Sequence, residues 1–291
     1  PNGQPANGVN NTPTSPITGG GIYGSAFGVA IDKLGYIWSG NFGWGGSQYW
    51  PASGSVTKLS PQGVPISPSA GYTSGLSRVQ GIAVDQSNNI WMASYQNNAV
   101  VVYPNGAPNP VSYIDSNTQP FGMAVASDGS AWVTYTNSDA VSKFTYSNGG
   151  IAKVFTVNLP SGSNPKGIAV DAQGNAWVAA GAISTVYAIN ASGSTVSTYT
   201  GQGLNGPWGI SVDAKGNIWV ANFGVDLPSA RYSIVQLCGA NSSNCPSGVA
   251  MGSAITPLTG FTLPSAGSQV LLNSGQTLYG NGSPPSYLPL M

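Results

Sequence analysis

The sequence contains no histidine and no glutamate, and all eight of its acidic residues are aspartates. A Ser-His-Asp triad, a histidine-ligated zinc ion and a pair of glutamates for acid and base work are therefore excluded within this chain. Only 5% of the residues are charged, against about 25% in an average soluble domain. The formal net charge is zero, so no positive field is available to attract nucleic acid. Apolar runs long enough to cross a bilayer are also missing, and we expect no membrane insertion.

Glycine and proline are abundant, with 41 and 22 copies among 291 residues. Such a composition without a hydrophobic pattern would indicate disorder. Here 41% of the residues are hydrophobic, and they recur in short runs of the kind that form strands between tight turns. The sequence therefore predicts a folded all-β protein.

Two cysteines, Cys238 and Cys245, enclose six small or polar residues. No histidine accompanies them, so they do not form a zinc motif, and we expect them to form a disulfide typical of an oxidising compartment. The sequence opens at Pro1 without a charged segment before an apolar stretch. We expect an extracellular or cell-surface protein whose signal peptide has been removed.

A motif of eleven residues recurs five times, and each copy begins with glycine and ends with tryptophan ten residues later. The copies occupy residues 28–38, 81–91, 122–132, 167–177 and 209–219. A sixth, degenerate copy can be read at Val270–Tyr279. The repeats cover most of the chain.

Each copy predicts a β-hairpin, because apolar residues alternate before an Asp-containing turn and a second strand follows with the tryptophan. A third apolar run follows each copy, at residues 56–59, 99–103, 141–144, 185–189 and 234–237. With a weaker fourth strand, each repeat has the size of a propeller blade. We expect the tryptophans to pack between neighbouring blades, and these are Trp38, Trp91, Trp132, Trp177 and Trp219.

The pattern G-[IVM]-[AS]-[VI]-D-x-x-G-[NY]-[IA]-W resembles the NHL repeat, and more broadly the propellers of streptogramin lyases and gluconolactonases. The resemblance implies a single six-bladed β-propeller of four-stranded antiparallel blades over residues 25–280. Residues 1–24 would be an extended N-terminal segment rich in Pro, Gly and Asn, and residues 281–291 an extended Pro-rich tail. Residues 14–24 would supply the outer strand of the last blade, which closes the ring, or would pair with a neighbouring subunit.

The repeated aspartates are expected to be structural, because an Asp at the start of a tight turn accepts hydrogen bonds from the backbone ahead of it. These are Asp32, Asp85, Asp171 and Asp213, with Asp128 shifted into its turn. Asp115, Asp139 and Asp226 remain, and Asp139 also has a turn context. Gluconolactonase-type sites use a Glu/Asp/Asn metal cluster and streptogramin lyases a histidine, so we expect no catalytic residue and no cofactor. A calcium ion in the channel is still compatible with the sequence, because Ca²⁺ accepts carbonyl, amide and carboxylate oxygen ligands.

Two loops after the repeated tryptophans begin with Asn-Phe-Gly and are rich in aromatic residues. Equivalent loops emerge on the same face of a propeller, so they predict one aromatic patch with polar neighbours. Such a surface suits sugar rings or a protein partner. The alternative is that these rings only cover the face of the propeller. The candidate binding residues are Phe42, Trp44, Tyr49, Trp50, Phe223, Asp226 and Arg231.

These observations favour a non-catalytic secreted protein with a structural or adhesive role. Its uncharged extended termini suggest self-assembly into a surface filament, since an extended segment can add a strand to a neighbouring sheet. Partners would be further copies of the chain, another surface protein or a glycan. A binding platform for carbohydrate or protein is one alternative, and a secreted lyase or lactonase is the other.

Overall fold

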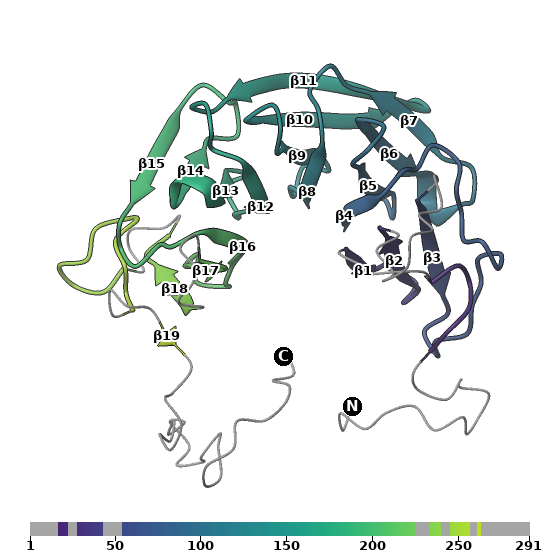
Figure 1. Cartoon of the computed structure of the whole chain (residues 1–291), viewed down its shortest axis with the longest axis horizontal. Coiled ribbons are helices and arrows are strands. Elements are labelled where there is room, and N and C mark those ends of the chain that lie inside the picture. The colour runs from purple at the N-terminus through teal and green to yellow at the C-terminus, as the bar shows by residue number, and fades with distance from the viewer. Residues whose placement is uncertain are drawn as a thin grey trace, which may run out of the picture.

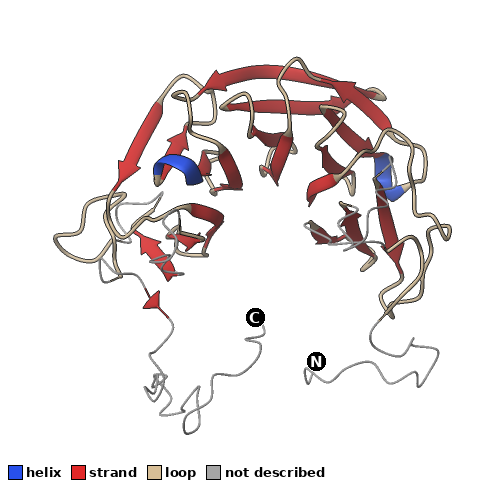
Figure 2. Ribbon diagram, viewed as in Figure 1, coloured by secondary structure: helices blue, strands red, loops and turns tan. Residues whose placement is uncertain are grey.

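A computed structural model describes residues 17–22, 28–42, 54–224, 233–239, 245–256 and 261–262. Within these residues the strands form five antiparallel sheets, each built from consecutive strands of the chain. Each sheet is one blade, and Figure 1 shows the five blades side by side in an arc. The innermost strands of all five blades line one central cavity, which we call the channel. Two single-turn 3₁₀ helices, η2 (Pro104–Gly106) and η3 (Gly181–Ile183), are the helical elements of the described part (Figure 2). None of the described helices has the length and apolar character needed to span a bilayer.

The strands follow the repeats, and each blade begins with its innermost strand. Blade 1 has β1 (Val29–Ile31), β2 (Ile37–Asn41) and β3 (Ser55–Leu59). Blade 2 has β4 (Val79–Val84), β5 (Ile90–Ser94), β6 (Ala99–Tyr103) and β7 (Val111–Ile114). Blade 3 has β8 (Pro120–Val125), β9 (Ala131–Tyr135), β10 (Ala140–Ser147) and β11 (Gly150–Asn158). Blade 4 has β12 (Pro165–Val170), β13 (Ala176–Ala180), β14 (Thr185–Ile189) and β15 (Val196–Thr200). Blade 5 has β16 (Pro207–Val212), β17 (Ile218–Asn222), β18 (Ser233–Leu237) and β19 (Phe261–Thr262).

The hydrophobic core lies between the blades. Trp38 of blade 1 packs in one cluster with Ile82 and Met92 of blade 2. Trp91, Trp132 and Trp177 each make the same kind of contact with the blade that follows. These four indoles are almost completely buried, whereas Trp219 of blade 5 is only partly buried. The repeated tryptophan therefore joins each blade to the next one.

The repeated glycine lies where the inner strands of neighbouring blades approach most closely. A Cβ atom at Gly122 would lie 2.3 Å from the carbonyl oxygen of Lys166, and one at Gly167 would lie 2.5 Å from that of Trp208. Gly28 and Gly81 have similar backbone neighbours in the next blade. Gly209 differs, because its nearest neighbour would be the Cβ atom of Ala221 in its own blade, at 3.6 Å. The glycine is thus required by blade packing and not by a positive φ angle.

The expectation of an all-β propeller with four-stranded antiparallel blades is confirmed, but the expected number of blades is wrong for the described residues. They form five blades and not six. The sixth, degenerate copy of the motif, at Val270–Tyr279, lies outside the described residues. Blade 1 has three strands, and its outer edge is covered by isolated bridges from Val56 to Tyr72 and from Leu59 to Pro65.

The described part of the N-terminal segment lies against the outer edge of blade 1. Ser67 donates a hydrogen bond from Oγ to the carbonyl oxygen of Gly20 at 2.7 Å. Residues 1–16 and the tail 281–291 lie outside the described residues, so ring closure or strand exchange by the termini stays a prediction.

The expected disulfide between Cys238 and Cys245 is confirmed. It begins directly after β18 and closes a short loop, with the two Cα atoms 5.5 Å apart. A disulfide is typical of proteins in an oxidising compartment.

Candidate functional site at the mouth of the channel

The repeated aspartates each hold a turn and a tryptophan at once. In blade 4, Asp171 Oδ1 accepts hydrogen bonds from the backbone N–H groups of Gln173 and Asn175. Its Oδ2 accepts the indole N–H of Trp177 at 2.9 Å. Asp32, Asp85 and Asp213 make the same contacts in their blades. The sequence predicts the turn bonds, and the constant spacing of six residues from Asp to Trp was the signal for the indole bond.

Blade 3 lacks this arrangement, because Ala126 occupies the position of the repeated aspartate. The indole nitrogen of Trp132 is buried and has no hydrogen-bond partner. Asp128 lies two positions after Ala126. It accepts hydrogen bonds from Ser130 and forms an ion pair with Lys143 at 3.3 Å. Burial alone would raise the pKa of Asp128, but these interactions outweigh it and lower the pKa.

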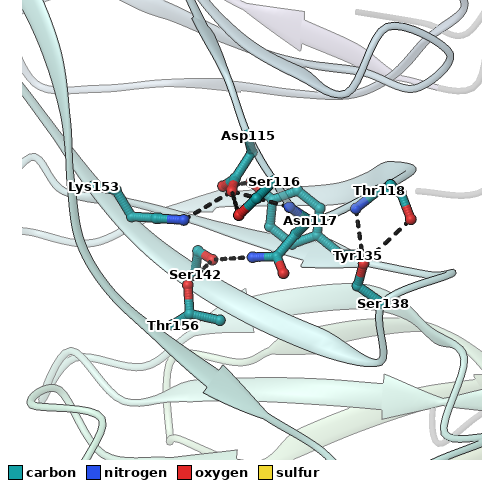
Figure 3. Close-up of polar contacts among 9 residues, drawn as sticks. All are labelled: Asp115, Ser116, Asn117, Thr118, Tyr135, Ser138, Ser142, Lys153 and Thr156. Atoms are coloured by element: carbon teal, nitrogen blue, oxygen red, sulfur yellow. Dashed lines mark hydrogen bonds and ion pairs between the residues drawn. The ribbon is translucent and has the colours of Figure 1, made fainter.

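Asp115 lies at the centre of a buried polar network between the outer strands of blades 2 and 3 (Figure 3). Its carboxylate accepts a hydrogen bond from Tyr135 Oη at 2.7 Å and one from Lys153 Nζ at 2.8 Å. The backbone N–H of Asn117 adds a third. The Asp115 side chain is completely buried and lies in the rim of the propeller, away from the inner strands, so its role is to join two blades.

The same network lowers the pKa of Asp115. Burial alone would raise this pKa, but the hydrogen bonds from Lys153, Tyr135 and Asn117 outweigh it. A lowered pKa means that the carboxylate stabilises the fold above its unfolded-state pKa, and that this contribution is lost as the pH falls through the folded-state pKa.

Replacement of Lys153 by methionine is therefore expected to lower the free energy of unfolding at pH 7 by about 2 kcal/mol, because a buried carboxylate loses its cation. The difference from the wild type should shrink as the pH falls from 7 through the lowered folded-state pKa of Asp115. Urea denaturation at a series of pH values from 7 into the acid range measures this. A difference that stays constant over this range would show that Lys153 acts through packing and not through Asp115.

The channel mouth is built from the residues directly before the repeated glycines. On four neighbouring inner strands these are Gln80, Phe121, Lys166 and Trp208. All four line a cavity of about 290 Å³ to which all five inner strands contribute. These four residues differ in type, so they give the channel mouth its own chemical character. The glycine after each of them is constant and allows neighbouring blades to pack closely.

A continuous series of aromatic contacts crosses this mouth. Phe42 packs against Tyr95 with 5.9 Å between ring centroids, and Tyr95 packs against Phe121 at 6.4 Å. Phe121 contacts Trp208 at 5.8 Å, and Trp208 contacts Phe223 at 5.2 Å. Phe42 and Phe223, from the two Asn-Phe-Gly loops, therefore lie at the two ends of one series of packed rings.

Lys166 projects between two of these rings. Its Nζ lies 4.7 Å from the centroid of Phe121 and 4.9 Å from that of Trp208. Desolvation by burial lowers the pKa of Lys166. Among the residues that the structure describes, no carboxylate forms an ion pair with it. Gln80 lies in the same cavity with only 3% of its surface exposed, and its Oε1 atom has no hydrogen-bond partner.

The sequence-based binding residues are placed only in part. Phe42 is buried beneath Arg78, whose guanidinium lies 5.4 Å from the Phe42 ring, and Phe223 is exposed. Trp44, Tyr49, Trp50, Asp226 and Arg231 lie outside the described residues. Sequence reasoning missed Gln80, Phe121, Lys166 and Trp208. The signal that it overlooked was their shared position before the repeated glycine.

No group of three or more acidic, cysteine or histidine side chains that suits a metal ion is present in the described ranges. Seven of the eight aspartates fall in these ranges, and all seven have structural hydrogen bonds. Asp139, the last of them, accepts from the backbone of Gly162 and Asn164. A calcium ion held by carbonyl and amide oxygens stays a prediction.

The sequence matches no protein-family model and no curated protein. Solved structures resemble the fold. Virginiamycin B lyase from Staphylococcus aureus is 16% identical, with 77% of this chain and 68% of that chain covered and a TM-score of 0.58. A gluconolactonase from Xanthomonas campestris is 16% identical, with 67% and 68% covered and a TM-score of 0.52. A chain of the nidogen/laminin complex is 16% identical, with 73% and 75% covered and a TM-score of 0.53.

The structural similarity to streptogramin lyase and gluconolactonase propellers that the repeats predict is confirmed. At these identities the similarity shows the β-propeller fold alone. For the staphylococcal lyase, a variant with histidine replaced by alanine is described as catalytically inactive, in complex with quinupristin.

Proposed function

We propose that this chain is a non-catalytic extracellular binding platform whose ligand sits at the channel mouth. The observation that carries the proposal is the chemistry of that mouth, which offers aromatic faces and the Lys166 cation. Each described carboxylate instead holds a turn, a tryptophan or a blade contact. Acid and base catalysis needs a titratable group at the reacting atoms, and binding does not.

The comparisons support binding more than turnover. The staphylococcal lyase is catalytically inactive when one of its histidines is replaced by alanine, and this chain contains no histidine. Metal-assisted lactone hydrolysis would need a ligand cluster, and the described residues offer none. The nidogen/laminin structure is a complex of two proteins and includes a chain of similar fold, which favours a role in protein binding. A secreted lyase or lactonase is therefore the weaker alternative.

Self-assembly is a second candidate, and the two ends of the arc favour it. Val29 and Ile31 of β1 are 61% and 66% exposed, although Ile82, the equivalent of Val29 in β4, is buried by blade 1. At the other end, Ile234 is exposed and Trp219 is only partly buried. Apolar sheet faces of this kind are normally covered, by another part of the chain or by a second copy. A structural or filament role through these faces is consistent with the uncharged sequence.

One pair of measurements separates these functions. We expect the purified chain to leave a glucono-lactone and a streptogramin B unchanged over a day by mass spectrometry, while it binds carbohydrate or protein ligands on an array. Turnover that is abolished by Asp115→Ala or Asp226→Ala, with the fold retained, would contradict the proposal in favour of an enzyme. Light scattering at rising concentration tests self-assembly, and ordered polymers would make the second candidate the main function.

A further inference from the structure

The channel mouth contains two groups of opposite kind that could bind a ligand. Lys166 is a partly buried cation without a counter-ion in the described structure, and the buried side-chain oxygen Oε1 of Gln80 has no hydrogen-bond donor. The two side chains come from different blades and line the same cavity. Buried polar groups in proteins nearly always have partners, so the Gln80 oxygen indicates that a ligand would supply a donor, and Lys166 indicates that it would supply a negative charge.

The charge requirement of the site is set by Lys166. Transfer of an ammonium group out of water is costly unless it is paired, and contacts with two aromatic rings compensate only part of that cost. The elements packed against β12 add no acid, because β8, β13, β16 and η3 contain no titratable residue. The one titratable group on β9, Tyr135, is bonded to Asp115. Because the described residues bring one cation and no acid to this site, they favour a ligand with one negative charge.

Gln80 and the aromatic rings narrow the ligand further. An orphan amide oxygen requires a hydrogen-bond donor such as a hydroxyl group. Phe121 and Trp208 offer ring faces, on which the C–H face of a sugar ring can pack. The cavity volume of about 290 Å³ is close to the lower end of known small-ligand pockets, about 300 Å³. A carboxylate, a hydroxyl donor and an apolar face occur together in a uronic acid residue.

We propose that the channel mouth binds an acidic saccharide, with the carboxylate of a uronic acid residue paired to Lys166 and a hydroxyl group donating to Gln80. This inference rests on the proposed binding function and names its ligand class. Phe121 and Trp208 would hold the sugar ring beside Lys166. The ion pair between the uronic acid carboxylate and Lys166 would provide a counter-ion for the one cationic residue that lines the cavity in the described structure.

The test compares methyl glucuronoside with methyl glucoside, which differ only in the carboxylate, by calorimetry and ligand-observed NMR on the full chain. We expect the glucuronoside to bind at least tenfold more tightly than the glucoside. Lys166→Met should remove this preference, and Lys166→Arg should retain most of it. Lys215→Met is the matched control. Lys215 lies in an exposed turn after the C-terminal end of β16, whereas the channel-mouth residue Trp208 lies at the N-terminal end of that strand.

Thermal unfolding of each variant separates a lost site from a lost fold. If Lys166→Met unfolds, Gln80→Ala and the two-ligand comparison on the wild type still test the proposal. Equal binding of both glycosides, or no binding of either, would overturn it. Binding of inorganic phosphate in place of the glucuronoside would overturn the saccharide assignment. Chemical change of either glycoside in the NMR samples would instead contradict the non-catalytic function, so the two failures are distinguishable.

Discussion

Replacement of Gly122 by alanine is expected to destabilise the propeller by about 3 kcal/mol, at the upper end of the cost of overpacking. The added methyl group would lie 2.3 Å from the carbonyl oxygen of Lys166. That oxygen belongs to the backbone of β12, so it cannot move away by a change of rotamer. The inner strands of blades 3 and 4 would have to separate, and the contacts of Trp132 with blade 4 would be weakened.

Gly209→Ala is the matched control for this experiment. Its Cβ atom would meet only Ala221 at an ordinary contact distance, and its φ angle is not positive, so we expect a change within about 1 kcal/mol. Urea denaturation followed by tryptophan fluorescence measures both variants. A loss at Gly209 as large as that at Gly122 would show that a further inner strand lies against blade 5, and that the five described blades are not the whole ring.

Replacement of Asp171 by alanine is expected to cost about 3 kcal/mol, because hydrogen bonds to a buried carboxylate are strong and their loss leaves donors unpaired. The backbone groups of Gln173 and Asn175 and the indole of Trp177 would all lose their acceptor. Trp177 packs against blade 5, so the damage would reach the interface between blades 4 and 5. Thermal unfolding by calorimetry measures the loss.

Ala126→Asp is the reverse experiment in blade 3. The backbone there forms the same turn, with the N–H group of Ala126 bonded to the carbonyl oxygen of Ser130, as Asp171 is bonded to Asn175. A carboxylate at position 126 would give Trp132 the partner that it lacks, and we expect a gain of about 1 kcal/mol. If Ala126→Asp destabilises the protein while Asp171→Ala has little effect, the Asp–Trp bond is not what stabilises the repeat.

Much of the fold could be predicted from the sequence because each hairpin is a local structure. The five third strands that the repeats predict all occur, as β3, β6, β10, β14 and β18. The turn aspartates bond within four residues of themselves, so residue type and spacing indicate them directly. The disulfide was equally local, because Cys238 and Cys245 are separated by only seven positions in the sequence.

The candidate site could be predicted only in part. Phe42 and Phe223 could be predicted as members of one site, because each is the second residue of an Asn-Phe-Gly loop. The structure connects their rings through Tyr95, Phe121 and Trp208. Lys166 and Gln80 occupy a position that is not constant among the repeats, so no pattern marked them. Asp115 looked free in the sequence, but it is held by Lys153 and Tyr135 from the neighbouring blade.

The sequence by itself determined the repeat, the hairpins, the turns and the absence of histidine chemistry, because these depend on residue identity and on contacts over short stretches of chain. Tertiary structure alone decided that Lys166 lies between Phe121 and Trp208, each more than 40 residues away, and that Gln80 shares their cavity. It also decided the reason for the repeated glycine, which is the approach of the next blade. These features depend on how the blades pack around the channel, and blade packing brings together side chains whose positions in the sequence carry no sign of their contact.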